Sequence, residues 1–177
     1  MNFGPRKVHV IQGEHAVSAE QDAILTTVLG SCVAACMHDP LAGVGGMNHF
    51  LLPEDTGRAA VGDEAMRYGA YAMEMLINDL MKLGARRERL EAKLFGGARL
   101  FDTLGDIGAS NAAFAKRFLE LEGITVTGGS LGGLSARRVE FWPASGRARQ
   151  RAVEQAPDLT RPPIRQVAPS TGGVELF

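Results

Sequence analysis

Short apolar runs separated by turn-forming residues make up most of the first 150 positions of the chain. Runs of about four to eight residues that are rich in Val, Ile, Leu, Phe or Thr, and are bounded by Gly, Pro, Asp or Ser, are typical of β-strands. The segments that fit this pattern are 8–11, 25–29, 33–38, 44–51, 92–95, 124–127 and 138–142. The pattern therefore predicts seven strands.

Two longer segments have the spacing of three and four residues that is typical of amphipathic helices. The first covers residues 64–83 and ends at Gly84, and its Met-rich apolar stripe is predicted to be core. The second covers residues 110–121, with Ser110 as its N-cap and Gly123 as its stop. Two helices and seven strands indicate a mixed α/β, α+β-like domain. Because the first strands have short connections, we expect them to pair as antiparallel hairpins in a sheet-based sandwich, with the helices outside.

The composition of the chain changes near residue 150. The 177 residues are about one domain's worth, and 45% hydrophobic with 22% charged residues is ordinary for a globular protein. Residues 151–177 carry four prolines and show neither helical nor strand periodicity. We therefore predict a single domain over residues 1–150 and a flexible Pro- and Arg-containing tail over residues 151–177. The apolar ending Leu176 and Phe177 leaves a docking peptide open as an alternative to a solvated linker.

Charge and hydropathy limit which partners and which cellular location are expected for the protein. The 19 Lys and Arg against 20 Asp and Glu give a net charge of −1, so nothing in the overall charge favours nucleic acid. No run approaches the roughly 18 apolar residues of a membrane span, and Glu14 and Glu20 interrupt the place of a signal-peptide core. The two cysteines, Cys32 and Cys36, suit a reducing compartment. We expect a cytoplasmic protein that is not embedded in a membrane.

The segment between residues 29 and 50 holds both cysteines and two of the four histidines. Within it, residues 39–42 read Asp-Pro-Leu-Ala, which is typical of a type I turn and predicts a β-hairpin. If Asp39 pairs with Ala42, the register places Cys32 directly opposite His49. Directly opposed side chains share a sheet face with Cβ atoms about 4.5–5.5 Å apart, so the thiol and the imidazole would touch.

A thiol beside an imidazole is the arrangement of a nucleophile and its base. A free thiol with a pKa of about 8.5 is mostly protonated at neutral pH, and a neighbouring imidazole can take its proton. Gly30 and Ser31 form a sharp start to the strand, where backbone N–H groups would face a developing oxyanion. The spacing therefore predicts cysteine-based catalysis at Cys32.

Two other interpretations of the same residues stay open at this stage. Free cysteines are among the most buried residue types, so Cys32 would then be structural. Zinc would find suitable ligand types in Cys32, Cys36, His38 and His49. Strand geometry disfavours zinc, because residues four apart on a strand are separated by about 13 Å.

Two strings in this segment resemble the chemoreceptor glutamine deamidase family (CheD). Residues 29–33 read Leu-Gly-Ser-Cys-Val, and residues 48–53 read Asn-His-Phe-Leu-Leu-Pro. Further landmarks follow in the order of the family: Arg67-Tyr68-Gly69, Lys93-Leu94-Phe95-Gly96-Gly97-Ala98, Ile107-Gly108 with Asn111, and Gly132-Gly133 before Arg137. The resemblance spans about residues 5–150.

The resemblance implies a hydrolase that converts particular glutamine side chains of methyl-accepting chemotaxis receptors to glutamate, that is, a protein-glutamine glutaminase. Some members of the family also hydrolyse glutamate methyl esters. The family's catalytic Cys, His and Thr match Cys32, His49 and Thr26, and Thr27 lies one residue from the last of these. We expect Cys32 to form a thioester, His49 to move the protons and Thr26 to orient the imidazole ring.

The resemblance also implies the fold and the partners. It implies a three-layer α/β/β sandwich, which is compatible with an early β-hairpin and two main helices. It implies no metal and no organic cofactor. The expected partners are the receptors, with a phosphatase of the chemotaxis pathway as a further one. A non-catalytic adaptor that binds receptors or this phosphatase stays open as the alternative.

Overall fold

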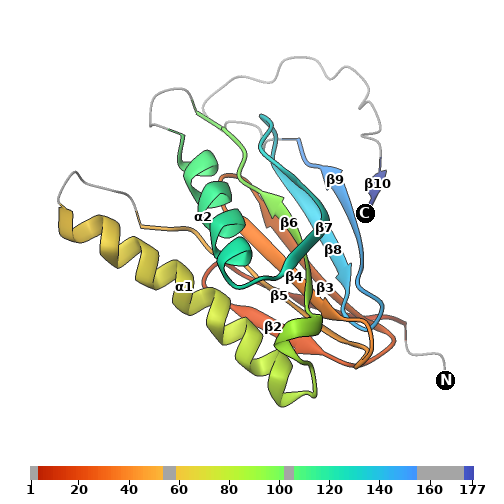
Figure 1. Ribbon diagram of the computed structural model, residues 1–177. Coiled ribbons are helices and arrows are strands. Elements are labelled where there is room, and N and C mark those ends of the chain that lie inside the picture. Colours follow the sequence, from red (N-terminus) through yellow and green to blue (C-terminus); the bar gives the residue numbers. More distant parts are fainter. Residues whose placement is uncertain (1–3, 54–58, 102–105, 155–173) are drawn as a thin grey trace, which may run out of the picture.

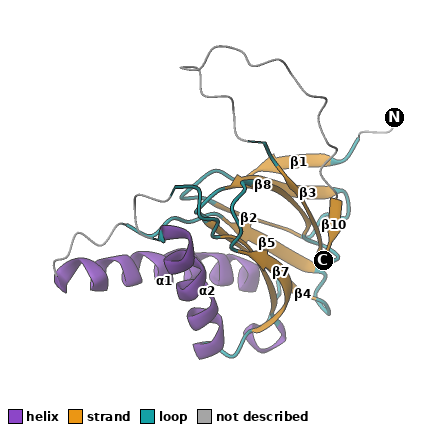
Figure 2. Ribbon diagram, turned by 90° about the horizontal axis from the view of Figure 1, so that it is seen from above, coloured by secondary structure: helices purple, strands orange, loops and turns teal. Residues whose placement is uncertain are grey.

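The computed structural model describes residues 4–53, 59–101, 106–154 and 174–177. Within these ranges, two five-stranded sheets pack face to face, and two helices cover the free face of one of them (Figure 1). We call the sheet beneath the helices the central sheet and the other one the outer sheet. Seen from above, helices, central sheet and outer sheet form three layers (Figure 2). The predicted α/β/β sandwich is confirmed.

Neighbouring strands of each sheet come from distant parts of the chain. The outer sheet contains, in spatial order, β1 (Arg6–His9), β3 (Ala23–Leu29), β8 (Arg137–Trp142), β9 (Arg147–Ala152) and β10 (Val174–Leu176). The central sheet contains β2 (His15–Ser18), β5 (Val44–Asn48), β4 (Val33–Asp39), β6 (Glu91–Gly96) and β7 (Thr125–Leu131). Consecutive strands β3 and β4 therefore belong to different sheets.

Both predicted helices are present, and both begin earlier than the pattern indicated. Helix α1 covers Ala59–Lys82 and helix α2 covers Ile107–Leu121. The N-cap of α2 is Asp106, not Ser110, because the Asp106 carboxylate accepts a hydrogen bond from the Ala109 N–H at 2.9 Å. A short 3-10 turn, η1 (Arg87–Arg89), lies between α1 and β6. Within the described ranges, no helix combines the length and the apolar character that crossing a bilayer requires.

Two apolar cores hold the three layers together. One lies between the helices and the central sheet and contains Met73, Leu76, Ile77 and Leu80 of α1, all fully buried. The other lies between the two sheets and contains Leu25, Leu29, Ala34, Cys36, Met47, Phe95, Val139 and Phe141. The Met-rich stripe is therefore core only in part, since Met66 and Met81 are 52% and 45% exposed.

The predicted pairing of the first strands as successive hairpins is wrong. Strand β1 pairs with β3 in parallel, β2 pairs with β5, and only β4 and β5 form the expected hairpin. The cause lies in the corner at residues 30–32, which carries the chain from the outer to the central sheet. The intervening strand β2 likewise belongs to the other sheet, so β1 and β3 run in the same direction.

The register of the β4–β5 hairpin also differs from the prediction, by two residues. Asp39 pairs with Val44 rather than with Ala42, and a further bridge joins Val33 to Phe50. The difference arises at Gly43, whose φ of +65° is left-handed and lengthens the loop to residues 40–43. The Gly43 N–H donates to the Asp39 carbonyl at 2.9 Å, which closes this longer loop.

Three strands were not predicted from the sequence: β2, β9 and β10. The predicted domain boundary at residue 150 falls inside β9, and β10 pairs antiparallel with β9. Phe177 packs edge-on against Phe95, with ring centroids 5.6 Å apart. The end of the predicted tail therefore docks on the same chain, while its residues 155–173 lie outside the described ranges.

Candidate active site

Cys32 lies at the corner that links the two sheets, and glycines allow neighbouring segments to approach this corner closely. The Cys32 carbonyl accepts a hydrogen bond from the Gly97 N–H at 2.8 Å, and the Gly30 carbonyl accepts one from the Ala98 N–H at 2.9 Å. A Cβ at Gly96 would lie only 2.1 Å from the Cys32 carbonyl oxygen. The backbone of this corner is therefore held by the segment that follows β6.

Helix α2 adds a second support to the corner. The Asn111 side chain is fully buried, and its Nδ2 donates to the Ser31 carbonyl at 2.9 Å. Its Oδ1 accepts from the Leu52 N–H at 3.0 Å. The Asn111 side chain thus links the residue before Cys32 to the segment that follows His49. This link fixes residues 29–33 and 48–53 relative to each other.

His49 follows β5, and its side chain lies between the two sheets. Its backbone is fixed on both sides by the loop after β1, because its N–H donates to the Glu14 carbonyl at 3.0 Å and its carbonyl accepts from the Gly13 N–H at 2.8 Å. The residue is 7% exposed. Its Nδ1 lies 2.9 Å from Thr27 Oγ1 and 3.3 Å from the Val10 carbonyl oxygen.

The hydrogen bonds of Thr27 decide where the imidazole carries its proton. The Thr27 hydroxyl has one proton, and it donates this proton to the Val10 carbonyl at 2.6 Å. Toward His49 the hydroxyl must therefore accept, so Nδ1 of the neutral ring is the protonated nitrogen. Nε2 then has a free lone pair, and it is buried without a hydrogen-bond partner among the described residues. A buried, unprotonated Nε2 is suited to act as a base.

The threonine that contacts the imidazole is Thr27, not Thr26 as the sequence suggested. The two neighbours point to opposite faces of β3, since side chains alternate along a strand. Thr27 faces the gap between the sheets, whereas Thr26 lines a groove on the opposite face of the outer sheet. The expectation that Thr26 orients the ring therefore does not match the geometry.

Cys32 and His49 share one face, but they are not directly opposed. The bridge between Val33 and Phe50 sets the register so that Ala34 faces His49. Cys32 is then a diagonal neighbour of His49, at a typical Cα separation of about 7–8 Å. The prediction that Cys32 lies directly opposite His49 is wrong. The two side chains still share one face of the sheet, because a register shift of two residues keeps side chains on the same face.

In this resting arrangement the thiol has another partner. The Cys32 Sγ donates to Oε1 of Gln12 at 3.4 Å, and Gln12 belongs to the same loop that fixes the His49 backbone. No pattern in the sequence indicates this contact, because residues 12 and 32 are brought together only by the packing of the two sheets. The Gln12 amide therefore lies over the candidate nucleophile.

The electrostatic environment favours the neutral form of both groups. Burial raises the pKa of the Cys32 thiol, and its own backbone N–H lowers the pKa by a smaller amount. Burial lowers the pKa of His49; the Val10 carbonyl works to raise that pKa, and nearby His9 to lower it. Both shifts favour a thiol with a neutral imidazole over a thiolate with an imidazolium.

The other residues of the zinc interpretation lie elsewhere. Cys36 is buried between the sheets, where burial strongly raises the pKa of its thiol. Nδ1 of His38 makes a hydrogen bond of 2.9 Å with the Pro143 carbonyl, far along the hairpin from Cys32. In the described part of the chain, no group of three or more His, Cys, Asp or Glu is arranged to hold a metal ion.

A thiol, a buried imidazole with a free Nε2 and a hydroxyl that fixes its tautomer define the chemistry of cysteine-dependent hydrolases. The family model described as "CheD chemotactic sensory transduction" matches residues 51–152. A "Probable chemoreceptor glutamine deamidase CheD" of Caulobacter sp. (strain K31) is 65% identical over 175 residues, which cover 97% of this chain and 93% of that protein. The chain belongs to the CheD family.

A second protein of the same name agrees with this membership. The protein of the same name from Acidiphilium cryptum (strain JF-5) is 59% identical over 179 residues, which cover 97% of this chain and 94% of that protein. Among solved structures, the hypothetical protein YfiH of Bacillus licheniformis has a TM-score of 0.42 at 12% identity, covering 75% of this chain and 60% of that chain. That structural likeness supports no argument on function.

Proposed function

We propose that this protein hydrolyses glutamine side chains of chemotaxis receptors to glutamate, with Cys32 as the nucleophile, His49 as the base and Thr27 as the residue that orients it. The observation that carries the proposal is the hydrogen bond from His49 Nδ1 to Thr27, which leaves Nε2 unprotonated on the face that Cys32 shares. The names of the similar proteins supply the substrate. A non-catalytic adaptor would have no use for this arrangement.

The first half of the reaction transfers the acyl group to sulfur. Nε2 of His49 takes the thiol proton as Cys32 Sγ bonds to the amide carbon of the substrate, and negative charge moves to the amide oxygen. The backbone N–H of Cys32, which lowers the pKa of the neighbouring thiol, is the donor that we assign to this oxyanion. His49 then returns the proton to the nitrogen as the carbon–nitrogen bond breaks, and ammonia leaves.

The second half regenerates the thiol. His49 takes a proton from a water molecule, whose oxygen attacks the thioester carbon, and the carbon–sulfur bond breaks. The sulfur recovers the proton from the imidazolium, and the substrate leaves as glutamate. A glutamate methyl ester would follow the same steps with methanol as the leaving group. Because Thr27 is neutral, it fixes the tautomer without the charge support that a carboxylate gives.

Binding of substrate must precede activation of the thiol in this scheme. Without substrate, Gln12 Oε1 accepts a hydrogen bond from the Cys32 thiol. This hydrogen bond stabilises the thiol and so disfavours the thiolate. A substrate carboxamide that takes the place of the Gln12 side chain would free the proton for Nε2. The partly buried position of Cys32 at a corner of the fold suits a glutamine presented by a protein surface.

Two further points remain predictions of the family resemblance. The protein is expected to act in the cytoplasm, on the part of the receptor that lies there. A phosphatase of the chemotaxis pathway is expected as a second partner.

The proposal is tested by mass spectrometry of a receptor cytoplasmic fragment incubated with the protein. Conversion of particular glutamines to glutamate, while other exposed glutamines of the fragment stay intact, would support it. A fragment whose glutamines all remain unchanged at long incubation and high enzyme concentration would contradict it. Incubation in ¹⁸O water provides a control, because hydrolysis places one solvent oxygen in each new carboxylate.

Thr27→Val is expected to lower kcat by about 10- to 100-fold with little change in KM, since the ring loses the partner that fixes its tautomer. Valine keeps the shape of threonine, so the change removes the hydroxyl alone. The same change at Thr26, on the other face of β3, should have a much smaller effect. Steady-state kinetics of the two variants, with circular dichroism to confirm folding, checks this; equal losses would show that Thr27 has no special role.

Alkylation of Cys32 by iodoacetamide is expected to be slow at neutral pH and to rise only above the pH at which ordinary thiols ionise. The reason is the raised pKa of Cys32 together with the lowered pKa of His49. Rates measured from pH 5 to 10 on Cys36→Ala protein, where Cys32 is the sole thiol, check this. A plateau of fast reaction between about pH 6 and 8 would instead indicate a preformed thiolate–imidazolium pair.

A further inference from the structure

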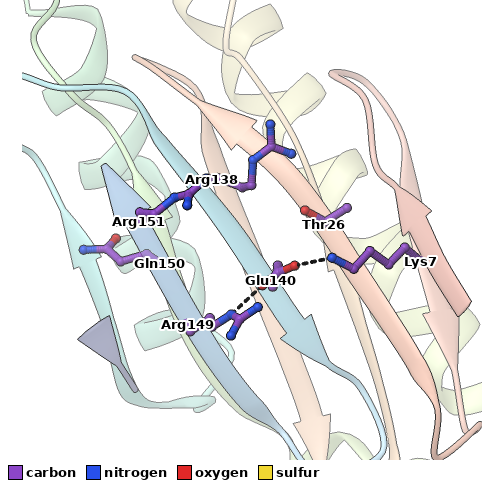
Figure 3. A pocket seen from close by; sticks show the side chains of 7 residues that line it. All are labelled: Lys7, Thr26, Arg138, Glu140, Arg149, Gln150 and Arg151. Carbon is purple, nitrogen blue, oxygen red and sulfur yellow. Dashed lines mark hydrogen bonds and ion pairs between the residues drawn. The ribbon is translucent and has the colours of Figure 1, made fainter. Parts of the chain in front are cut away.

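A groove of about 470 Å³ lies on the exposed face of the outer sheet, on the side of β3 opposite to His49. Four neighbouring strands supply its lining: β1, β3, β8 and β9 (Figure 3). The residues are Lys7, Thr26, Arg138, Glu140, Arg149, Gln150 and Arg151. The proposed deamidation makes no use of this groove.

The charges of the groove are unbalanced. Glu140 is the one carboxylate among the described residues that line it. Both of its oxygens are engaged: Oε1 accepts from Lys7 Nζ at 2.8 Å and Oε2 from Arg149 Nε at 2.5 Å. Burial works to raise the pKa of Glu140, but these two cations outweigh it and lower the pKa, so the carboxylate stays ionised. With four cations and one anion, the described lining of the groove carries three net positive charges, on a chain whose net charge is −1.

Two of the arginines have no counter-ion within the described ranges. Arg138 of β8 and Arg151 of β9 are directly paired across the strands, and neither forms an ion pair with a residue in the described ranges. Like charges directly opposite each other on one sheet face destabilise the pair. An anion bound between the two guanidinium groups would offset this repulsion and accept charge-assisted hydrogen bonds from both of them.

A buried hydroxyl points to the same place. Thr26 is 7% exposed and lines the groove, and its Oγ1 has no hydrogen-bond partner among the described residues. Thr26 occupies the same cross-strand row as Glu140 and Arg149. Burying a hydroxyl without a hydrogen-bond partner costs free energy. Its presence here therefore indicates that the hydroxyl donates to a ligand bound in the groove.

We propose that this groove binds a phosphoryl group, held by the guanidinium groups of Arg138 and Arg151 and by the Thr26 hydroxyl. A guanidinium offers paired N–H donors that match phosphate oxygens, and a doubly charged group neutralises most of the excess charge. A single carboxylate would leave two positive charges uncompensated. The phosphoryl group comes either from a small phosphorylated molecule or from a phosphorylated side chain of a protein.

Isothermal titration calorimetry at constant ionic strength tests the proposal with inorganic phosphate and with acetate. Wild-type protein is expected to bind phosphate at least about 10-fold more tightly than acetate, because two guanidinium groups and a hydroxyl fit a dianion better. Arg138→Gln and Arg151→Gln are each expected to weaken phosphate binding by about 10-fold. Arg147→Gln is the matched control: Arg147 lies on β9 over the Trp142 ring, outside the groove lining, and its loss should change affinity less than about two-fold.

Thr26→Val is the second variant, and it separates binding from folding. It should weaken phosphate binding by about three- to ten-fold without lowering Tm, because the hydroxyl makes no hydrogen bond in the described protein. A phosphoserine peptide that binds more tightly than inorganic phosphate would indicate a protein source, and the reverse order a small molecule; both orders support the groove. Equal affinities for phosphate and acetate, or unchanged phosphate binding by the Arg138→Gln, Arg151→Gln double variant, would overturn it.

Discussion

Replacing Cys32 by alanine is expected to lower the rate of glutamine deamidation by at least about 10⁴-fold, since loss of a nucleophile removes the covalent route altogether. The other parts of the site stay in place in this variant. His49 keeps its hydrogen bond to Thr27, and the corner keeps the backbone hydrogen bonds from Gly97 and Ala98. The loss should therefore appear in kcat, while binding of a receptor fragment and the Tm remain close to those of the unmodified protein.

Cys36→Ala is the matched control for the first prediction. Cys36 is the second free thiol of the described chain, but it is buried in the core between the sheets. Its replacement should cost about 1 kcal/mol of stability from the small cavity and leave kcat nearly unchanged. Mass spectrometry after acid quench should find an acyl adduct on Cys32 in the Cys36→Ala protein. Activity above roughly 1% of wild type in Cys32→Ala would remove Cys32 from the mechanism.

The face that Cys32 and His49 share could be predicted from sequence even though their register could not. Side chains alternate with a period of two, so an error of two residues in the hairpin register changes the separation but not the face. The error came from Gly43, whose left-handed φ lengthens the loop. The sequence Asp-Pro-Leu-Ala alone does not reveal whether the following glycine belongs to the loop or to the strand.

The choice between Thr26 and Thr27 could not be predicted from sequence, because an error of one residue does change the face. Thr26 and Thr27 differ by one position, and one position on a strand separates the two faces of the sheet. Which of them faces His49 depends on how β3 packs against the central sheet. That in turn depends on the corner at residues 30–32, where β3 and β4 enter different sheets. Local patterning holds no information on this choice.

Strand β9 could have been found in the sequence. Residues 147–152 read Arg-Ala-Arg-Gln-Arg-Ala, and the arginines alternate with smaller residues in the period of a strand. The three arginines lie on the solvent face, while Ala148 is fully buried in the core between the sheets. The high charge of the segment is also typical of a solvated linker, but strict alternation at period two is the stronger signal. The seven-residue groove depends on this strand.

Replacing Asp39 by alanine is expected to destabilise the protein by about 3 kcal/mol, a large part of a typical total of about 5–15 kcal/mol. The Asp39 carboxylate is fully buried, and Oδ2 accepts from Arg89 Nη2 at 2.7 Å and from the Arg86 N–H at 2.9 Å. Oδ1 accepts from the N–H groups of Leu41 and Ala42 at 2.9 and 3.0 Å. Alanine would leave these donors without their acceptor.

The pH dependence of this loss follows from the pKa of Asp39. Burial works to raise that pKa, but Arg89 and the backbone N–H groups of Ala42, Arg86 and Leu41 outweigh burial and hold it well below its usual range. A carboxyl group with a lowered folded pKa stabilises fully above its unfolded pKa of about 3.9. This contribution is lost as the pH falls toward the folded pKa. The difference in unfolding free energy between wild type and Asp39→Ala should therefore shrink below about pH 4.

Urea unfolding at pH 7 and at pH 3 measures both effects. Asp79→Ala is the control: this carboxylate also forms ion pairs, with His15 at 2.6 Å and Lys82 at 2.8 Å, but its side chain is 28% exposed. Its removal should cost less than about 1 kcal/mol, because solvent screens exposed pairs. If Asp39→Ala lowers the free energy of unfolding no more than Asp79→Ala does, burial of the Asp39 ion pair adds nothing to stability.

The Asp39 variant should lose stability without losing chemistry. Asp39 lies at the turn of the β4–β5 hairpin, and Cys32 precedes the opposite end of the same strand, about 23 Å away in extended chain. The corner at Cys32 is held by Asn111 and by the backbone hydrogen bonds from Gly97 and Ala98, none of which depends on the turn. Well below its lowered Tm, Asp39→Ala should keep the kcat of the wild type. A parallel fall of kcat and stability would mean that the turn, and not the corner, fixes Cys32 against His49.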